Sequence, residues 1–124
     1  TVGDLLYEEI PETHPSDTLA QVALKVSEGG KGIAVVQDNE NYVQGIITDG
    51  DIRRLIESGT DLHDAVAENV MTTDPVTTSA ETPAIRALET IEEYSITQLV
   101  VTDSENEFLG IVHIHDIMNQ GISK

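Results

Sequence analysis

The chain has 124 residues, of which 39% are hydrophobic, with one Phe, no Trp and no Cys. This length gives room for one compact unit with a small aliphatic core, and the lack of Cys excludes disulfides and thiolate metal sites. A formal net charge of −17, from 23 acidic and six basic residues, argues against nucleic acid and anionic membrane surfaces as partners.

Helix and strand signals alternate along the first half. Apolar residues at helical spacing follow Ser16-Asp17-Thr18, and two β-branched runs later flank a cluster of turn residues. The expected elements are a helix from Leu19 that stops at Gly29-Gly30, strands over Ile33–Val36 and Tyr42–Ile47 around a turn at Asp38–Asn41, and a helix over Ile52–Ser58 closed by Gly59.

The second half repeats this plan after a stretch that we expect to be a connecting helix, within Asp61–Met71. Thr82 is expected to be an N-cap, with Pro83 at the first helical position. The expected elements are a helix over Ala84–Glu93, strands over Leu99–Val101 and Phe108–Val112 around a turn at Ser104–Glu107, and a helix over Asp116–Gln120 that stops at Gly121.

The two halves are copies of one segment. Residues 35–52 align without a gap on residues 100–117, a shift of 65 positions, and nine of eighteen residues are identical. Self-similarity of this kind is the mark of a repeat architecture. We divide the chain into a first repeat over 1–60, a connecting helix over 61–68 and a second repeat over 69–124.

These repeats resemble the CBS domain in their order of elements, in Asn69-Val70-Met71-Thr72, and in Gly-Ile-Ile-Thr-x-x-Asp at Gly45–Asp51. Two in tandem resemble a Bateman module. The resemblance implies an α+β fold of α/β-type repeats, in which two β-α-β-β-α repeats pack as a pseudo-twofold CBS pair.

A closer resemblance rests on GIITDGDIRR at 45–54 and GIVHIHDI at 110–117. These segments are similar to the regulatory half of arabinose 5-phosphate isomerases, in which a sugar isomerase domain precedes the CBS pair and serves Kdo and lipopolysaccharide biosynthesis. We therefore expect the chain, which opens at Thr1, to be a piece of such a polypeptide, with an N-terminal sugar isomerase domain as a partner in the same protein. The absence of Cys fits a reducing interior, and we expect the protein to be cytoplasmic.

Thr48-x-x-Asp51 has two interpretations. As structure it is close to a capping box, in which each residue bonds the backbone amide of the other. As a site, the free amides of a helix N-terminus and the Thr48 hydroxyl suit a phosphate, while the Asp51 carboxylate suits a ribose diol.

The resemblance to CBS modules assigns Thr48 to phosphate and Asp51 to ribose, and it places the base in an apolar cleft near Ile10, Pro11 and Ile33. Four basic side chains of the first repeat could neutralise the charge of a phosphate or simply lie in solvent: Lys25, Lys31, Arg53 and Arg54. We include Arg53 among the expected ligand residues.

The second repeat departs from the pattern because His113 replaces the hydroxyl residue, whereas Asp116 keeps the diol position. An imidazole can donate to phosphate, so the two sites should not be equivalent. His113, His115 and Asp116 also resemble a metal constellation, but three ligands crowded into four residues usually need another from elsewhere, and we expect no metal.

The leading hypothesis is a regulatory module that senses a nucleotide or nucleotide sugar, either AMP or ATP, or CMP or CMP-Kdo, with no required cofactor and with homodimerisation through CBS pairs. The alternative is a ligand-free structural dimerisation module. Catalysis by the chain itself is not expected, because it has neither Cys nor a GxSxG or P-loop pattern. Nucleic acid and membranes are not expected partners.

Overall fold

The computed structural model describes residues 1–120, so the expected stop at Gly121 lies outside the described residues. The chain divides into two compact units. The first-repeat unit is Glu9–Pro75, and the second-repeat unit joins Thr1–Glu8 to the chain from Val76 onward.

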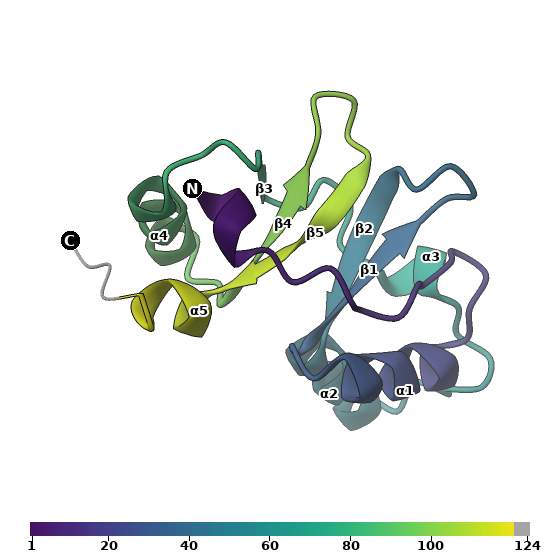
Figure 1. Ribbon diagram of the computed structural model, residues 1–124. Helices are drawn as coiled ribbons and strands as arrows, with labels where there is room; N and C mark the ends of the chain where they lie inside the picture. Colours follow the sequence, from purple (N-terminus) through teal and green to yellow (C-terminus); the bar gives the residue numbers. More distant parts are fainter. Residues whose placement is uncertain (121–124) are drawn as a thin grey trace. The chain divides into compact units, whose positions relative to one another are not determined.

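The first-repeat unit is a two-stranded antiparallel sheet covered on one face by helices (Figure 1). Strand β1 is paired with β2 so that Ile33 lies opposite Thr48. The entry strand of the expected β-α-β-β-α order is reduced to a single parallel bridge between Thr13 and Val36. Its elements are α1 (Leu19–Gly29), β1 (Ile33–Gln37), β2 (Val43–Thr48), α2 (Asp49–Glu57) and α3 (Ala67–Val70).

The bounds of α1 follow from its caps. The Gln21 amide donates to Thr18 Oγ1 at 3.2 Å, and the Thr18 amide donates to the Gln21 side-chain oxygen at 2.8 Å, which completes a capping box. At the other end, Gly30 adopts a left-handed conformation with φ of 69°, which residues other than glycine adopt at a cost. The stop predicted at Gly29-Gly30 is therefore confirmed.

The helices bury one face of the sheet through residues spaced alternately along the strands. Ala34, Val36 and Ile47 contribute from the sheet, whereas Ile33 and Val35 alternate to the opposite face. The buried cluster comprises Leu19, Val22, Val26, Ala34, Val36, Ile47, Ile52 and Ala67.

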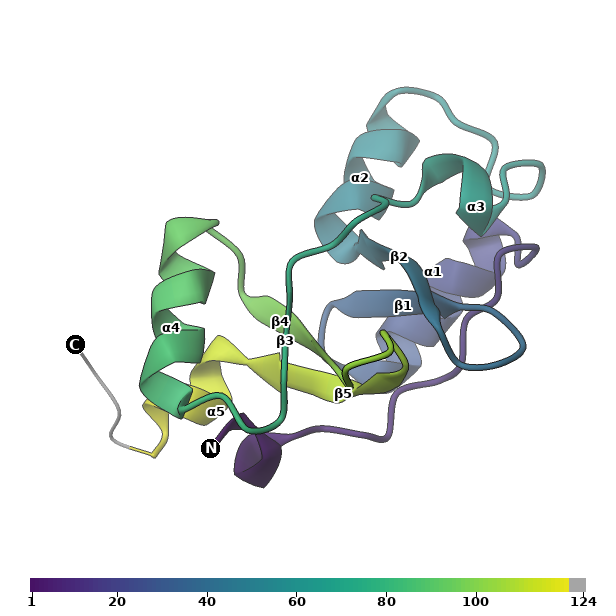
Figure 2. The ribbon, with the colours of Figure 1, turned by 90° about the horizontal axis from the view of Figure 1, so that it is seen from above.

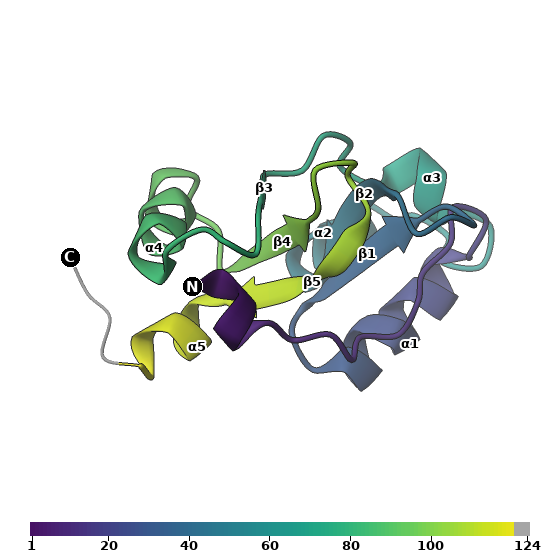
Figure 3. The same cartoon turned by 45° about the horizontal axis from the view of Figure 1, so that its top comes forward.

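The second-repeat unit is a three-stranded sheet in the order β3-β4-β5, with β3 parallel to β4 (Figure 3). Helices α4 and α5 cover it, and η1 at the N-terminus lies beside α5 (Figure 2). Its elements are η1 (Val2–Leu5), β3 (Thr77–Thr78), α4 (Ala84–Glu93), β4 (Gln98–Thr102), β5 (Phe108–His113) and α5 (Ile114–Met118). Val2, Ala87, Leu99 and Val112 are among the buried residues of its core.

The two hairpins are built alike. The Oδ1 atom of Asp38 accepts the amides of Glu40 and Tyr42, and the Oδ1 atom of Asp103 accepts those of Glu105 and Glu107. Asn41 and Asn106 each take positive φ, of 68° and 67°. Aspartate and asparagine therefore fix both turns at the predicted places.

Each sheet is extended by a chain segment that crosses a glycine. In the first-repeat unit Thr72 and Ile46 exchange backbone hydrogen bonds of 2.9 and 3.0 Å, and a Cβ on Gly45 would lie 2.7 Å from the Thr72 carbonyl oxygen. In the second-repeat unit Tyr7 bonds Ile111 in the same way, and a Cβ on Gly110 would lie 2.8 Å from the Tyr7 carbonyl oxygen. The start of each repeat thus completes the sheet of the other repeat.

Two expectations about helices are corrected. The connecting helix expected over 61–68 is confined to α3, and residues 62–64 form turns, because the Asp61 carbonyl and side chain accept the amides of the next residues. The N-cap of α4 is Pro83 rather than Thr82, whose hydroxyl oxygen accepts a hydrogen bond of 2.9 Å from the Thr78 hydroxyl.

None of the helices within residues 1–120 has the length and apolar character needed to span a bilayer.

Replacing Gly45 or Gly110 with Ala should lower the free energy of unfolding by about 1–3 kcal/mol, because the new methyl group must displace backbone. Gly50→Ala is the control, since its Cβ would meet only ordinary contacts at 3.5 Å or more. Urea unfolding of the three variants measures the effect. Equal stabilities for Gly45→Ala and Gly50→Ala would contradict the close approach.

Asp17 should stabilise the first-repeat unit only while it is ionised. Burial would raise the pKa of its carboxyl, but the His14 amide at 3.0 Å and the Lys25 ammonium at 2.6 Å outweigh burial and lower the pKa below 3.8. Its contribution is therefore present above about pH 4 and is lost as the pH falls through the lower folded-state value.

Asp17→Asn should accordingly reduce the free energy of unfolding at neutral pH by about 1 kcal/mol. The difference from the parent chain should shrink in acid, which urea unfolding between about pH 3 and pH 7 measures. A difference that stayed constant over that range would rule out an ionic contribution from Asp17.

Candidate functional site

The junction between β2 and α2 brings Thr48 and Asp51 together. β2 ends at Thr48, which is the N-cap of α2. The Asp51 amide donates to Thr48 Oγ1 at 3.2 Å, and the Thr48 amide donates to Asp51 Oδ2 at 2.9 Å. The structural interpretation of this motif is therefore realised as a complete capping box.

The other oxygen of the Asp51 carboxylate is engaged by Arg54. Arg54 Nη2 donates to Asp51 Oδ1 at 2.6 Å, one turn further along α2. The Asp51 side chain is 27% exposed and the Arg54 side chain 69%. Partial burial would raise the pKa of the Asp51 carboxyl, but the bonds from Thr48 and Arg54 outweigh burial and lower it. Asp51 is therefore an ionised acceptor at neutral pH.

Asp51 and Arg54 line a depression of about 320 Å³, together with Leu55, Ser58 and Val70. We call it the Asp51 pocket. Four of its residues come from α2 and its C-cap, and Val70 comes from α3. Its lining combines an anion, a cation, a hydroxyl and two aliphatic side chains, which suits a ligand with polar and apolar parts.

The other predicted ligand residues of the first repeat lie at different places. Ile33 is buried and pairs with Thr48 across the sheet. Ile10 and Pro11 lie against the end of α1, where a Cβ on Gly29 would be 3.6 Å from Ile10 and 3.2 Å from Pro11. Arg53 is exposed. Within the described chain, the lining of the Asp51 pocket includes neither these four residues nor Thr48.

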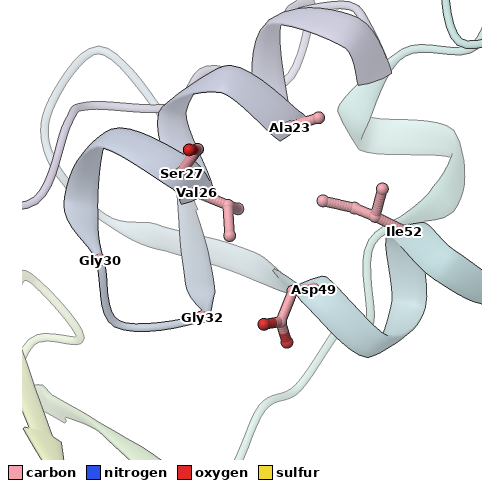
Figure 4. Close-up of a pocket in the computed structure, with 7 residues that line it drawn as sticks. All are labelled: Ala23, Val26, Ser27, Gly30, Gly32, Asp49 and Ile52. Atoms are coloured by element: carbon pink, nitrogen blue, oxygen red, sulfur yellow. The ribbon is translucent and has the colours of Figure 1, made fainter.

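A second depression of the same unit, of about 430 Å³, lies between α1 and α2. Val26 and Ile52 point toward each other across it from the two helices (Figure 4). Asp49, at the start of α2, is the acidic residue of its lining. With Ala23 and two glycines as further members, this groove offers mostly apolar surface to a ligand.

A third depression, of about 500 Å³, belongs to the second-repeat unit. It lies at the hairpin end of β4 and is lined by hydroxyl side chains such as Thr78, Ser79 and Ser104, and by Glu81 and Asp103. The hydroxyl groups of Thr78 and Ser79 are both hydrogen bonded to Thr82.

At the second-repeat position equivalent to Thr48, His113 is the N-cap of α5. Its Nδ1 atom accepts the His115 amide at 3.1 Å, and the two imidazole rings lie 4.8 Å apart. Asp116 lies in the first turn of α5. An imidazole thus takes over the capping role of a hydroxyl, so the two repeats present different chemistry at matching positions.

The described residues, 1–120, contain no group of three or more His, Asp or Glu side chains arranged to hold a metal ion. The metal interpretation of His113, His115 and Asp116 thus gains no support from the geometry.

Sequence reasoning did not single out Arg54, Leu55, Ser58 or Val70 as neighbours of Asp51. Arg54 could have been found from its spacing, because residues three apart on a helix share a face. Val70 could not, since only the fold of α3 brings it to α2.

The family comparison matches the chain twice. The CBS domain family covers residues 2–58 and again residues 66–122. The two matched segments correspond to the repeats and together span most of the chain.

Curated relatives include an arabinose 5-phosphate isomerase, KdsD, from Francisella tularensis subsp. tularensis. It is 41% identical over 110 residues, which cover 89% of this chain and 33% of the relative. The chain therefore spans about a third of the length of the curated relatives it matches.

Solved structures with the same fold include CBS domain protein PAE2072 from Pyrobaculum aerophilum complexed with AMP, with a TM-score of 0.82, 23% identity, and coverage of 93% of this chain and 88% of that one. Another is the CBS domain pair of protein MJ0100 in complex with 5'-methylthioadenosine and S-adenosyl-L-methionine, with a TM-score of 0.84, 23% identity and coverage of 97% and 94%. These likenesses confirm the predicted fold class. The chain belongs to the CBS domain family and consists of two CBS domains in tandem.

Proposed function

We propose that this CBS pair is a regulatory module that binds a nucleotide and modulates a sugar isomerase domain. The observation that carries the proposal is the Asp51 pocket, where an ionised carboxylate and a guanidinium lie beside Leu55 and Val70. A carboxylate accepts the two hydroxyls of a ribose, and a guanidinium binds phosphate. The aliphatic side chains offer a surface to a base.

Similarity to other proteins supports the ligand class and the context. Two proteins of the same fold are in complex with adenosine derivatives, and the curated relatives are arabinose 5-phosphate isomerases. We therefore propose an adenine or cytidine nucleotide as the ligand, with CMP-Kdo as the feedback candidate for an isomerase of Kdo biosynthesis. Modulation then requires that the ligand binds the states of the protein with different affinities.

In the proposed site Thr48 and Asp51 are ligand residues of the first repeat, with Ile10, Pro11, Ile33 and Arg53 as the further candidates. The Asp51 carboxylate can hold the capping box and bind a ligand at the same time. Its two oxygens offer about four lone-pair positions, of which the Thr48 amide and Arg54 each use one. His113 and Asp116 remain the candidates of the second repeat. We propose that the protein is cytoplasmic.

We also propose that the pair self-associates through its helices. Leu24 on α1 is 66% exposed and Ile56 on α2 is 53% exposed, and these helices pack against each other. Exposed aliphatic residues on neighbouring helices favour a protein interface. They also support the alternative function, a ligand-free structural dimerisation module.

Titration calorimetry with AMP, ATP, CMP and CMP-Kdo tests the proposed function. We expect saturable binding of at least one of them, and Asp51→Ala should lower its affinity by about tenfold or more because a charged acceptor is lost. Absence of binding by all four would favour the structural module.

Asp51→Ala also removes a capping box, which should cost about 1 kcal/mol of stability. Gln21→Ala is the matched control, because it removes the equivalent residue from the capping box of α1. We expect it to reduce stability similarly while leaving affinity unchanged. Equal loss of affinity in both variants would show that Asp51 acts only through folding.

Replacing Leu24 and Ile56 together with Glu should shift the chain toward monomer, measured by light scattering after size-exclusion chromatography. Gln21→Glu is the control, since it adds a negative charge to α1 at an exposed position compatible with the capping box. A dimer that survives the double substitution would place the interface elsewhere.

A further inference from the structure

The Asp51 pocket differs from the two other depressions described above in the charge of its lining. Within the described chain, the lining of those two includes acidic residues but no basic one, whereas Arg54 lines the Asp51 pocket. A guanidinium is the side chain best suited to bind a phosphate through more than one hydrogen bond. The pocket is therefore equipped for an anionic group.

The surroundings make this cation necessary for an anionic ligand. Asp49 and Asp51 both lie in the first turn of α2, and the chain as a whole carries 23 acidic against six basic residues. A phosphate brought beside the Asp51 carboxylate would be repelled unless an opposite charge lay within a few ångströms. Arg54 lies at that distance from Asp51, with 2.6 Å between Nη2 and Oδ1.

Arg54 can bind an anion without releasing Asp51. Its bond to Asp51 uses Nη2, and a guanidinium has five N–H donors in a planar fork. The side chain is 69% exposed, so solvent rather than packed protein surrounds most of the fork. An exposed ion pair of this kind contributes little to stability, so its rearrangement costs little.

The second repeat gives an internal comparison. The shift of 65 positions places Asp116 on Asp51, Asn119 on Arg54 and Met118 on Arg53. The carboxylate is retained, but both basic residues are replaced by uncharged ones. The basic residues at positions 53 and 54 thus have no basic counterpart at the equivalent positions of the second repeat.

From these observations we infer that Arg54 is the specificity-determining residue of the first-repeat site and makes it select nucleoside phosphates over unphosphorylated nucleosides. This inference rests on the proposed function and adds to it the residue that recognises the phosphate.

The test is calorimetric titration of the 124-residue chain with two pairs of probes, CMP with cytidine and AMP with adenosine. For the parent chain we expect the nucleotide of at least one pair to bind about tenfold or more tightly than its nucleoside. Arg54→Gln should reduce that preference to about twofold or less by weakening the nucleotide alone.

Arg86→Gln is the matched control. Arg86 is also 69% exposed and also pairs with an acidic residue three positions away on its helix, Glu89, but it lines none of the three depressions. We expect its substitution to leave both affinities unchanged. Far-ultraviolet circular dichroism of both variants verifies that the fold is retained.

The outcomes separate this inference from the proposed function. Suppose that the parent chain prefers the nucleotide. If Arg54→Gln then lowers the affinities for nucleotide and nucleoside equally, or leaves both affinities unchanged, the role of Arg54 is overturned while the proposed function stands. If Arg53→Gln alone removes the preference, the phosphate is recognised by Arg53 instead. If the parent chain binds none of these four probes, this inference is overturned, and the proposed function fails only if ATP and CMP-Kdo also do not bind.

Discussion

The structure of each unit depends on one close approach between two backbones. Gly45 and Gly110 lie inside β2 and β5, and in both units a second chain segment is hydrogen bonded to the residue that follows the glycine. A side chain at either glycine would occupy the volume of that segment. Glycine in a strand usually weakens it, so its presence here reflects the need for contact rather than for flexibility.

This contact determines which parts of the chain depend on one another. Tyr7 pairs with β5 of the second-repeat sheet, and Thr72 pairs with β2 of the first-repeat sheet. Each sheet is therefore extended by a residue that belongs to the other repeat. The contact also fixes β2, whose last residue, Thr48, begins α2 and so positions Asp51 and Arg54.

Local features of the fold could be predicted from the sequence, and long-range ones could not. Helix α1, both hairpins and the Thr48–Asp51 capping box depend on residues within about four positions of each other, and their signals are explicit. The prediction of a helix over 61–68 was wrong. The apolar spacing there favours a helix, but Asp61 accepts the amides of the residues that follow it and forms a turn. The crossing of Gly110 by residues far away in sequence leaves no local trace except the glycine itself.

In the proposed site one carboxylate would serve both the fold and a ligand. In the first repeat Asp51 closes the capping box and pairs with Arg54, so its pKa is already lowered before any ligand is present. A group held ionised and oriented by the fold binds hydroxyls without a further ordering cost, which is the advantage of a preorganised site. In the second repeat His113 caps α5 instead, and an imidazole accepts the amide through Nδ1 only while that atom carries no proton. The two repeats, alike in backbone, therefore differ in the side chain that caps the helix carrying the acidic residue.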